Sequence, residues 1–298
     1  MIEMLRSNAR GLLSRLSSGY GVTIGNQPSS FCCLVCHDMD DIKDEDSFDR
    51  VIDFDRELGI RATLFVMRNQ LKFKGAIHKA RRLGFEIGLH NTRRPYIHFA
   101  IPYTSEIQVS KFTEMFYSRL LKGELKVFDK AGVQVSGFAP HGISCHLFYD
   151  TNADWDIIEN AALSCGILWV RGYRGIIKTD NGGGFGCPIP PYWRIKGESR
   201  KLVIPVSWDD KFLFPSWEEK TFYGGGLVSE NSRALENIKG KLVFCEEQSI
   251  PFVINIHPDH WLRGVLKTDW LLRDVISLCR DRRCPVYTFT ELYHQVAE

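Results

Sequence analysis

Polar side chains of catalytic type follow several short apolar runs of the sequence. Asp38 and Asp40 end the run FCCLVCHDMD, His90 ends FEIGLH, His141 follows VSGFAP, and His257 follows PFVINI. Carboxylates and imidazoles suit a divalent cation such as zinc, and equally nickel, cobalt or iron. A bound cation activates water and stabilises an oxyanion, while an Asp accepts a proton and a His donates one to a leaving amine. The residue types therefore indicate metal-assisted hydrolysis of an acyl bond.

Each of these residues also has an ordinary structural explanation. An Asp before a helix commonly caps the helix, and a single His after a strand is more often satisfied by nearby backbone groups than bound to a metal. A further strand end carries Trp208, Asp209 and Asp210 after the run KLVIPVS. Five polar strand ends are harder to explain one by one, and together they favour a shared site.

Apolar runs of strand length alternate with stretches of helical periodicity along almost the whole chain. The expected strands lie within residues 29–38, 60–67, 85–90, 135–142, 166–170, 201–210, 251–258 and 284–289, and the expected helices within 45–58, 74–83, 105–131, 154–164, 229–248, 269–280 and from 290 to the end. This alternation predicts an α/β fold, and seven or eight units favour a closed or nearly closed (β/α) barrel over an open doubly wound sheet. The carboxyl ends of parallel barrel strands meet on one face, which would gather the polar strand ends.

One interval, residues 171–200, breaks this alternation. It contains GGGFGCPIPPYW, is rich in Gly, Pro and aromatic residues, and shows no helical pattern. We expect an ordered loop over one face of the barrel, next to the substrate cleft. Without an internal repeat, residues 1–298 are interpreted as one barrel domain, with residues 1–28 as an N-terminal helical extension.

The composition is that of an ordinary globular protein, with 44% hydrophobic residues and a formal net charge of +2. The near-neutral charge argues against nucleic acid as a partner. The N-terminus lacks the apolar core of a signal peptide, and no stretch approaches the roughly 20 apolar residues of a membrane span. We therefore expect a cytoplasmic protein with no transmembrane segment, whose weakly amphipathic N-terminus would allow peripheral membrane contact.

The chain contains nine cysteines, an odd number that favours reduced thiols when no export signal is present. Cys33 and Cys36 form one CxxC inside an apolar run, and no second CxxC completes a four-cysteine zinc site. We expect both side chains to be buried in a strand.

The quoted runs resemble the motifs of the polysaccharide deacetylases, also called the NodB-homology or carbohydrate esterase family four proteins. HDMDD is similar to the first motif and LGIRATLFV to the strand after it, while GFEIGLHN, GFAPHG and VINIHPDHW resemble the second, third and last motifs. The resemblance runs from about residue 31 to the C-terminus. It implies a barrel of the glycoside hydrolase/deacetylase type, with Asp38 as general base, Asp40 and His90 as metal ligands, and His257 as general acid.

The chain departs from the family pattern in the metal motif. Arg94 stands four residues after His90, where the family usually has a second metal-binding His, and an Arg cannot coordinate the ion. His141 is our preferred replacement and His98 is the other candidate. Loss of the ion is the third alternative.

A second departure concerns the partner of the base. Phe138 stands where the third motif usually has an Arg that pairs with the catalytic Asp. Arg93, Arg94 or Arg171 could replace that Arg, or could bind an anionic substrate.

The remaining assignments concern acidic and aromatic residues. Asp41 is the rival of Asp40 as a metal ligand, but the D-x-D spacing places Asp38 and Asp40 on the same face of an extended strand end. Asp209 or Asp210 could orient a catalytic His. The candidate substrate-binding residues are Arg94, Trp208 and Asp209.

We expect a metal-dependent deacylase, most simply a zinc enzyme, that removes an N-acetyl or N-formyl group from an amino sugar. A cytoplasmic location favours a nucleotide-linked or lipid-linked precursor of a surface polysaccharide. The alternatives are cleavage of another non-peptide C–N bond and a catalytically silent carbohydrate-binding protein. Five aromatic residues have two interpretations, stacking on a sugar ring or packing in the core: Trp169, Tyr192, Trp193, Trp208 and Trp217.

Overall fold

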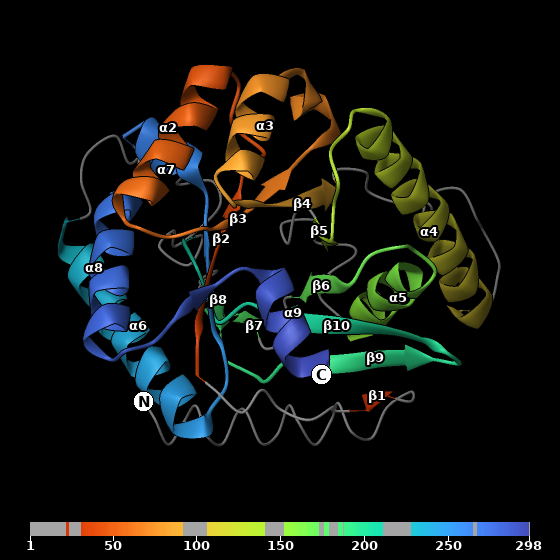
Figure 1. Cartoon of the computed structure of the whole chain (residues 1–298). Helices are drawn as coiled ribbons and strands as arrows, with labels where there is room; N and C mark the ends of the chain where they lie inside the picture. The colour runs from red at the N-terminus through yellow and green to blue at the C-terminus, as the bar shows by residue number, and fades with distance from the viewer. Residues whose placement is uncertain are drawn as a thin grey trace.

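The computed structural model describes residues 22–23, 31–91, 106–140, 152–172, 176–178, 184–186, 188–210, 228–264 and 267–297. Its strands form one large mixed sheet and a separate two-stranded sheet, with helices packed around the outside (Figure 1). Among the described residues, no helix is both long enough and apolar enough to cross a membrane.

Parallel strands form the centre of the large sheet. Five of them pair side by side in chain order: β2 (Cys33–Asp38), β3 (Thr63–Val66), β4 (Glu86–Asn91), β5 (Gly137–Pro140) and β6 (Trp169–Gly172). The late strand β12 (Phe252–Ile256) pairs in parallel with the other edge of β2, so the first and last motifs of the sequence become neighbours.

One continuous segment joins the two edges of this parallel sheet. Strand β10 (Ser199–Pro205) pairs with β6, and β11 (Trp208–Asp209) pairs with β12. Between them, the N–H of Val206 donates to the carbonyl of Gly172 and the N–H of Ser207 donates to the carbonyl of Val253, each at 2.9 Å. The expected α/β fold of barrel type is thereby confirmed, and its strands curl around one hydrophobic core.

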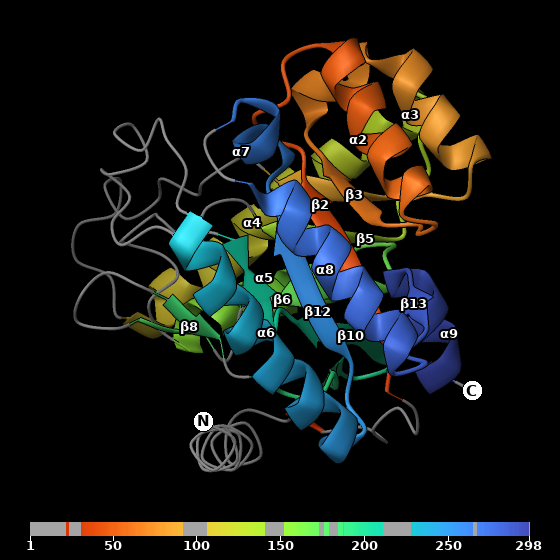
Figure 2. The same cartoon turned by 90° about the vertical axis from the view of Figure 1, so that its left-hand side faces the viewer.

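Most helices lie where the sequence predicts them: α2 (Glu45–Glu57), α3 (Lys74–Arg82), α4 (Glu106–Lys130), α5 (Asn152–Leu163), α6 (Val228–Gln248), α8 (Thr268–Asp281) and α9 (Phe289–Ala297). Helix α2 begins at the Asp44 cap, whose carboxylate accepts a 2.7 Å hydrogen bond from the N–H of Ser47. Helices α6 and α8 pack side by side next to β12 (Figure 2). The one-turn helix α7 (Pro258–Leu262) and a 3₁₀ turn over Arg68–Lys72 were not expected.

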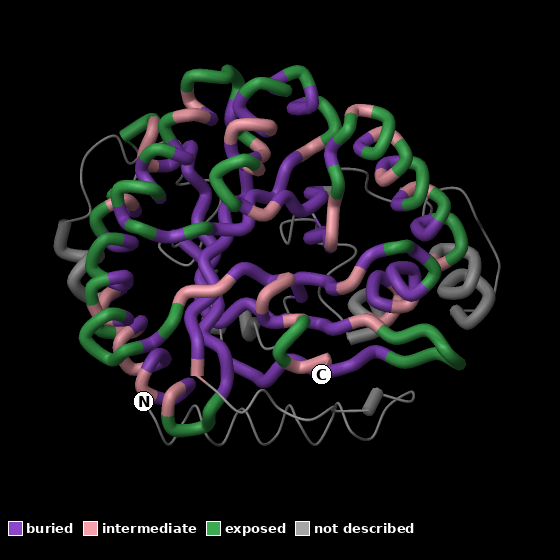
Figure 3. The backbone as a smooth tube through the Cα atoms, viewed as in Figure 1, coloured by how far each residue is buried: buried purple, intermediate pink, exposed green. Residues whose placement is uncertain are grey.

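The central strands are buried, whereas the outer faces of the helices and the tip of the β9–β10 hairpin are exposed (Figure 3). Cys33 and Cys36 are both completely buried in β2, as expected. Inside the barrel, the Trp169 ring packs edge-on against Phe65, with ring centroids 5.8 Å apart. Gly137 lies directly beside this indole, so any side chain at position 137 would overlap the ring.

The expectation of a loop across residues 171–200 is wrong where that interval forms strands. It contains β7 (Ile176–Lys178), β8 (Gly184–Gly186), β9 (Tyr192–Lys196) and the start of β10. Strand β9 pairs antiparallel with β10 through a turn at Gly197, whose φ of +60° suits glycine. The Gly and Pro residues therefore separate short strands. Strand β13 (Val286–Tyr287) pairs with β2.

The predicted N-terminal helical extension, residues 1–28, lies outside the described residues except at two positions. Val22–Thr23 form strand β1, which pairs antiparallel with β9.

Candidate active site

The carboxyl ends of the parallel strands bring distant polar residues together, as the barrel topology predicts. Six side chains with at most 2% exposure gather there: Asp38 from β2, His90 from β4, Arg171 from β6, Asp209 from β11, Asn255 from β12, and His257 directly after β12. Buried charges are costly unless they are paired. The contacts among these residues therefore define the site.

Arg171 is the ion-pair partner of Asp38. Its two terminal nitrogens donate to the two carboxylate oxygens, Nη1 to Oδ1 and Nη2 to Oδ2, the latter at 2.9 Å. The guanidinium also stacks over the Phe65 ring, 4.4 Å from its centroid. Burial would raise the pKa of Asp38, but Arg171, followed by His90 and His257, holds that pKa well below its usual value. Asp38 is therefore an ionised carboxylate.

Asn255 connects this ion pair to a second carboxylate. Its Oδ1 accepts a 2.7 Å hydrogen bond from Arg171 Nη1. Its Nδ2 donates to Asp38 Oδ2 at 3.2 Å and to Asp209 Oδ2 at 2.9 Å. The sequence analysis missed Asn255, although it is the one amide side chain inside the apolar run FVINI.

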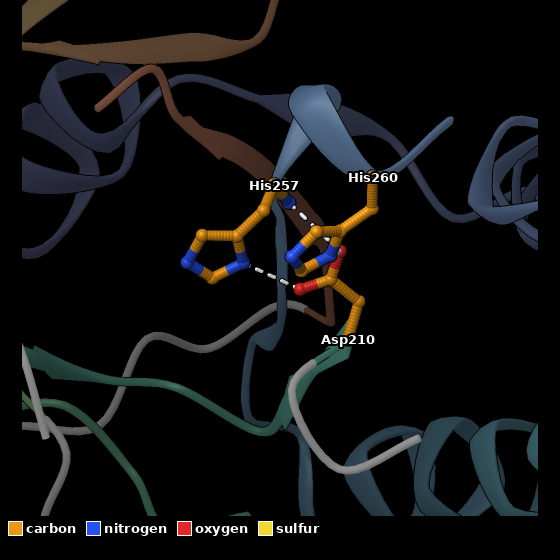
Figure 4. A group of neighbouring side chains, drawn as sticks. All are labelled: Asp210, His257 and His260. Carbon is orange, nitrogen blue, oxygen red and sulfur yellow. Dashed lines mark hydrogen bonds and ion pairs between the residues drawn. The ribbon is translucent and has the colours of Figure 1, made fainter. Parts of the chain in front are cut away.

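Asp210 holds His257 from the side opposite to Asp38. Its Oδ1 lies 2.5 Å from His257 Nδ1, and its Oδ2 accepts a 2.9 Å hydrogen bond from the His257 backbone N–H (Figure 4). Oδ2 also lies 2.9 Å from His260 Nδ1. Burial would raise the pKa of Asp210, but the neighbouring imidazoles of His257 and His260 lower it far below its usual value. Of the two expected partners for a catalytic His, Asp210 makes the close contact.

Two imidazoles reach the carboxylate of Asp38. His257 Nε2 lies 3.3 Å from Asp38 Oδ2, and His90 Nε2 lies 3.8 Å from the same oxygen. The proposed base and the proposed acid are thus direct neighbours, each held by a second charged partner.

His90 has the geometry of a metal ligand. Its Nδ1 lies 3.2 Å from the carbonyl oxygen of Ala139, which fixes the proton on Nδ1 and leaves Nε2 as the coordinating nitrogen. Asp40 is half-buried in the turn after β2, and its rival Asp41 is exposed. His141 and His98, the candidates for the missing ligand, lie outside the described residues. Among the described residues, neither His90 nor Asp40 belongs to a set of three ligand-type side chains whose ligand atoms all lie within 4.8 Å of one another.

A different trio also has ligand-type side chains. Among the described residues, Asp210, His257 and His260 form the one set of three His, Cys, Asp or Glu side chains whose ligand atoms all lie within 4.8 Å. However, the 2.5 Å and 2.9 Å separations are those of hydrogen bonds. Two ligands of a tetrahedral zinc ion, each about 2.0–2.1 Å from it, would lie roughly 3.4 Å apart. We therefore interpret this trio as a hydrogen-bonded group.

The candidate substrate-binding residues have varied positions. Trp208 is 2% exposed and packs in the hydrophobic core, and Asp209 is completely buried against Asn255. Arg94 lies outside the described residues, as do Arg93 and Trp217. The other aromatic residues considered for sugar stacking are buried: Trp169, Tyr192 and Trp193.

No protein-family model matches the sequence, and no curated protein matches it. Among solved structures, the chain is similar to a protein from Mycobacterium smegmatis assigned as a polysaccharide deacetylase, with 17% identity and a TM-score of 0.56 over 94% of each chain. This likeness shows that the chain has the fold of that protein.

Two further structures are similar at lower TM-scores. One is the Xyl-CE4 domain of a multidomain xylanase from the hindgut metagenome of Trinervitermes trinervoides, with 13% identity over 90% of this chain and 91% of that one and a TM-score of 0.45. The other is a CE4 family pseudoenzyme from Bacillus anthracis, with 14% identity over 89% of this chain and 66% of that one and a TM-score of 0.45. Because these scores are lower, we draw no conclusion from either structure.

Proposed function

We propose that this protein is a metal-dependent deacylase that hydrolyses the N-acetyl or N-formyl amide of an amino sugar. The observation that carries the proposal is the 3.3 Å approach of His257 Nε2 to Asp38 Oδ2. Arg171 keeps the base ionised, while Asp210 fixes the ring of the acid. Amide hydrolysis requires a base for the attacking water and an acid for the leaving amine.

His90 would hold a divalent cation through Nε2, together with Asp40 and with His141 in place of the missing second His. When bound, such a cation polarises the amide carbonyl and a water molecule. Zinc is our first candidate, and nickel, cobalt and iron suit the same ligands.

Asp38 accepts the proton of the attacking water. Its carboxylate is anchored by Arg171 and Asn255, so the accepting oxygen stays in place throughout the reaction. His257 then donates the proton on Nε2 to the leaving nitrogen, because its Nδ1 is engaged by Asp210. Since Asp38 Oδ2 and His257 Nε2 are neighbours, a proton accepted by the base can return the acid to its protonated form.

We infer a nucleotide-linked or lipid-linked amino sugar as the substrate, in the cytoplasmic assembly of a surface polysaccharide. This part of the proposal rests on the sequence alone. Arg94 would bind the anionic carrier. The buried side chains of Trp208 and Asp209 would support the residues that line the site.

The alternative functions differ in what they require of Asp38. A hydrolase of another non-peptide C–N bond needs the same base and acid, whereas a silent carbohydrate-binding protein needs neither. The closely packed arrangement of Asp38, Arg171, His257 and Asp210 favours an enzyme, because burying two ion pairs costs stability that binding alone would not require.

The test is release of acetate from N-acetylated sugar oligomers and nucleotide-linked N-acetyl amino sugars, and of formate from their N-formyl counterparts, with Zn²⁺, Co²⁺ or Ni²⁺ supplied. We expect Asp38→Asn to lower turnover by about a hundredfold or more. Asp129→Asn, on the exposed face of α4, is the matched control and should be as active as the wild type. Equal activity of the two variants, or release of neither acetate nor formate from any substrate, would contradict the proposal.

A further inference from the structure

A second imidazole, His260, shares the carboxylate that holds the proposed acid. Asp210 Oδ1 contacts His257 Nδ1 at 2.5 Å, whereas Oδ2 contacts His260 Nδ1 and the His257 backbone N–H, each at 2.9 Å. His260 is 3% exposed and Asp210 is completely buried. Figure 4 shows both rings directed at this one carboxylate.

The short helix α7 produces this arrangement. His257 caps the helix, Pro258 occupies its first position, and the His260 N–H donates to the His257 carbonyl at 3.0 Å. Residues three apart on one helical turn lie on the same side. The two rings consequently stack, with centroids 5.2 Å apart and an interplanar angle of 29°.

The orientation of the Asp210 carboxylate decides where the His257 ring points. A carboxylate rotates readily about its terminal bond. A contact between Oδ1 and the His257 ring could not by itself fix the carboxylate, because that ring is the group to be oriented. Two contacts on Oδ2, from the His260 ring and from the His257 backbone N–H, hold the carboxylate independently of the His257 ring, and His260 supplies the one that comes from a side chain.

Two other carboxylates lie near the ring of His257. Asp209 Oδ1 lies 3.8 Å from Nδ1, a distance too long for a hydrogen bond, and Asp38 Oδ2 lies on the opposite side at 3.3 Å from Nε2. The contact with Asp210 is therefore the shortest of the three. Rotation of the Asp210 carboxylate would turn His257 Nε2 away from Asp38.

We propose that His260 is a positioning residue that fixes the Asp210 carboxylate and, through it, the ring of His257. The consequence for turnover rests on the proposed function, whereas the hydrogen-bond geometry does not. If His260 merely fills space in α7, an apolar side chain of similar size would leave His257 undisturbed.

The experiment is proton NMR of the full-length protein carrying ¹⁵N-labelled histidine. An imidazole N–H bonded to a buried carboxylate gives a far-downfield resonance, which is assigned to His257 by its absence in His257→Asn. We expect this resonance to persist in His260→Asn, whose side-chain N–H can still donate to Asp210. We expect it to move upfield or exchange away in His260→Leu.

The control is His37→Leu, which removes a buried imidazole that contacts Asp55 at 3.0 Å. His37 and Asp38 are successive residues of β2, so their side chains point to opposite faces of the sheet. The His257 resonance should be unchanged in this variant. An unchanged resonance in His260→Leu would overturn the proposal. So would its equal loss in His37→Leu, because loss of any buried imidazole would then have the same effect.

Turnover provides the second measurement. We expect His260→Leu to lower kcat about tenfold at an unchanged KM, and His260→Asn to restore most of that loss. If the wild type lacks deacylase activity, the NMR result still decides the positioning role. If the wild type is active but the resonance and kcat of His260→Leu are unchanged, only the positioning role fails.

Discussion

The guanidinium of Arg171 in β6 forms a two-point ion pair with the carboxylate of Asp38 at the end of β2. Both side chains are almost completely buried, with 0% and 2% exposure. The planar fork of an Arg matches a carboxylate in a way that the single ammonium of a Lys cannot. Arg171 thus both orients the proposed base and helps to keep it ionised.

Arg171→Leu should destabilise the protein by about 3–5 kcal/mol, because it leaves the carboxylate of Asp38 buried without its partner. Arg171→Lys keeps a positive charge but loses the second hydrogen bond, so it should be less harmful. Urea unfolding measures the loss of stability in both variants. Arg200→Leu, at an exposed position, is the control. A free energy of unfolding for Arg171→Leu equal to that of this control would refute the role of the ion pair.

Asp210→Asn should change how stability depends on pH. The lowered pKa of Asp210 keeps it ionised in the folded state, whereas the unfolded chain binds a proton near pH 4. This group therefore stabilises the fold above that pH, and its contribution is lost as the pH falls, by up to about 1.4 kcal/mol per pH unit. The Asn side chain of the variant takes up no proton in this pH range.

The wild type should consequently be more stable than Asp210→Asn at pH 7, and the difference should narrow as the pH falls from about 5 to 3. Unfolding in urea at each pH gives this difference. Asp129→Asn, at an exposed position, should show the same pH dependence as the wild type. A constant difference between wild type and Asp210→Asn would mean that folding does not lower the pKa of Asp210.

Gly137→Ala tests the packing of the barrel interior. The added methyl group would overlap the indole of Trp169, and overpacking a core costs about 1–3 kcal/mol or more. Gly123→Ala is the matched control: no heavy atom lies within 4 Å of its added Cβ, and it lies in α4. That change should stabilise by about 1 kcal/mol. Thermal unfolding compares them, and equal effects would mean that Trp169 does not fill this space.

The sequence predicts the fold well because strand-length apolar runs and helical stretches are local patterns. Helix α2, for example, begins at the predicted residue 45, and the structure shows that Asp44 caps it. The strands within residues 171–200 were missed because each is short and bounded by Gly or Pro. Helix α7 was missed because a single turn has no periodicity to detect.

The site was harder to predict because its contacts join residues far apart in the sequence. Asp38 and His257 were predicted from motifs, whereas the pairing of Arg171 with Asp38 depends on the position of β6 in the barrel. Asn255 looked like part of a core strand, since only the pairing of β12 with β2 reveals that it faces Asp38. The sharing of Asp210 by two imidazoles likewise requires the folded geometry.

The most direct test of a metal hydrolase is the metal content of the purified protein, measured by plasma mass spectrometry before and after reconstitution. We predict near-stoichiometric zinc, nickel, cobalt or iron in the wild type, and loss of the ion in Asp40→Ala, His90→Ala and His141→Ala. His260→Ala should retain it. An ion that is lost in His260→Ala but kept in His90→Ala, or a wild type that binds no divalent ion even after reconstitution, would contradict the account.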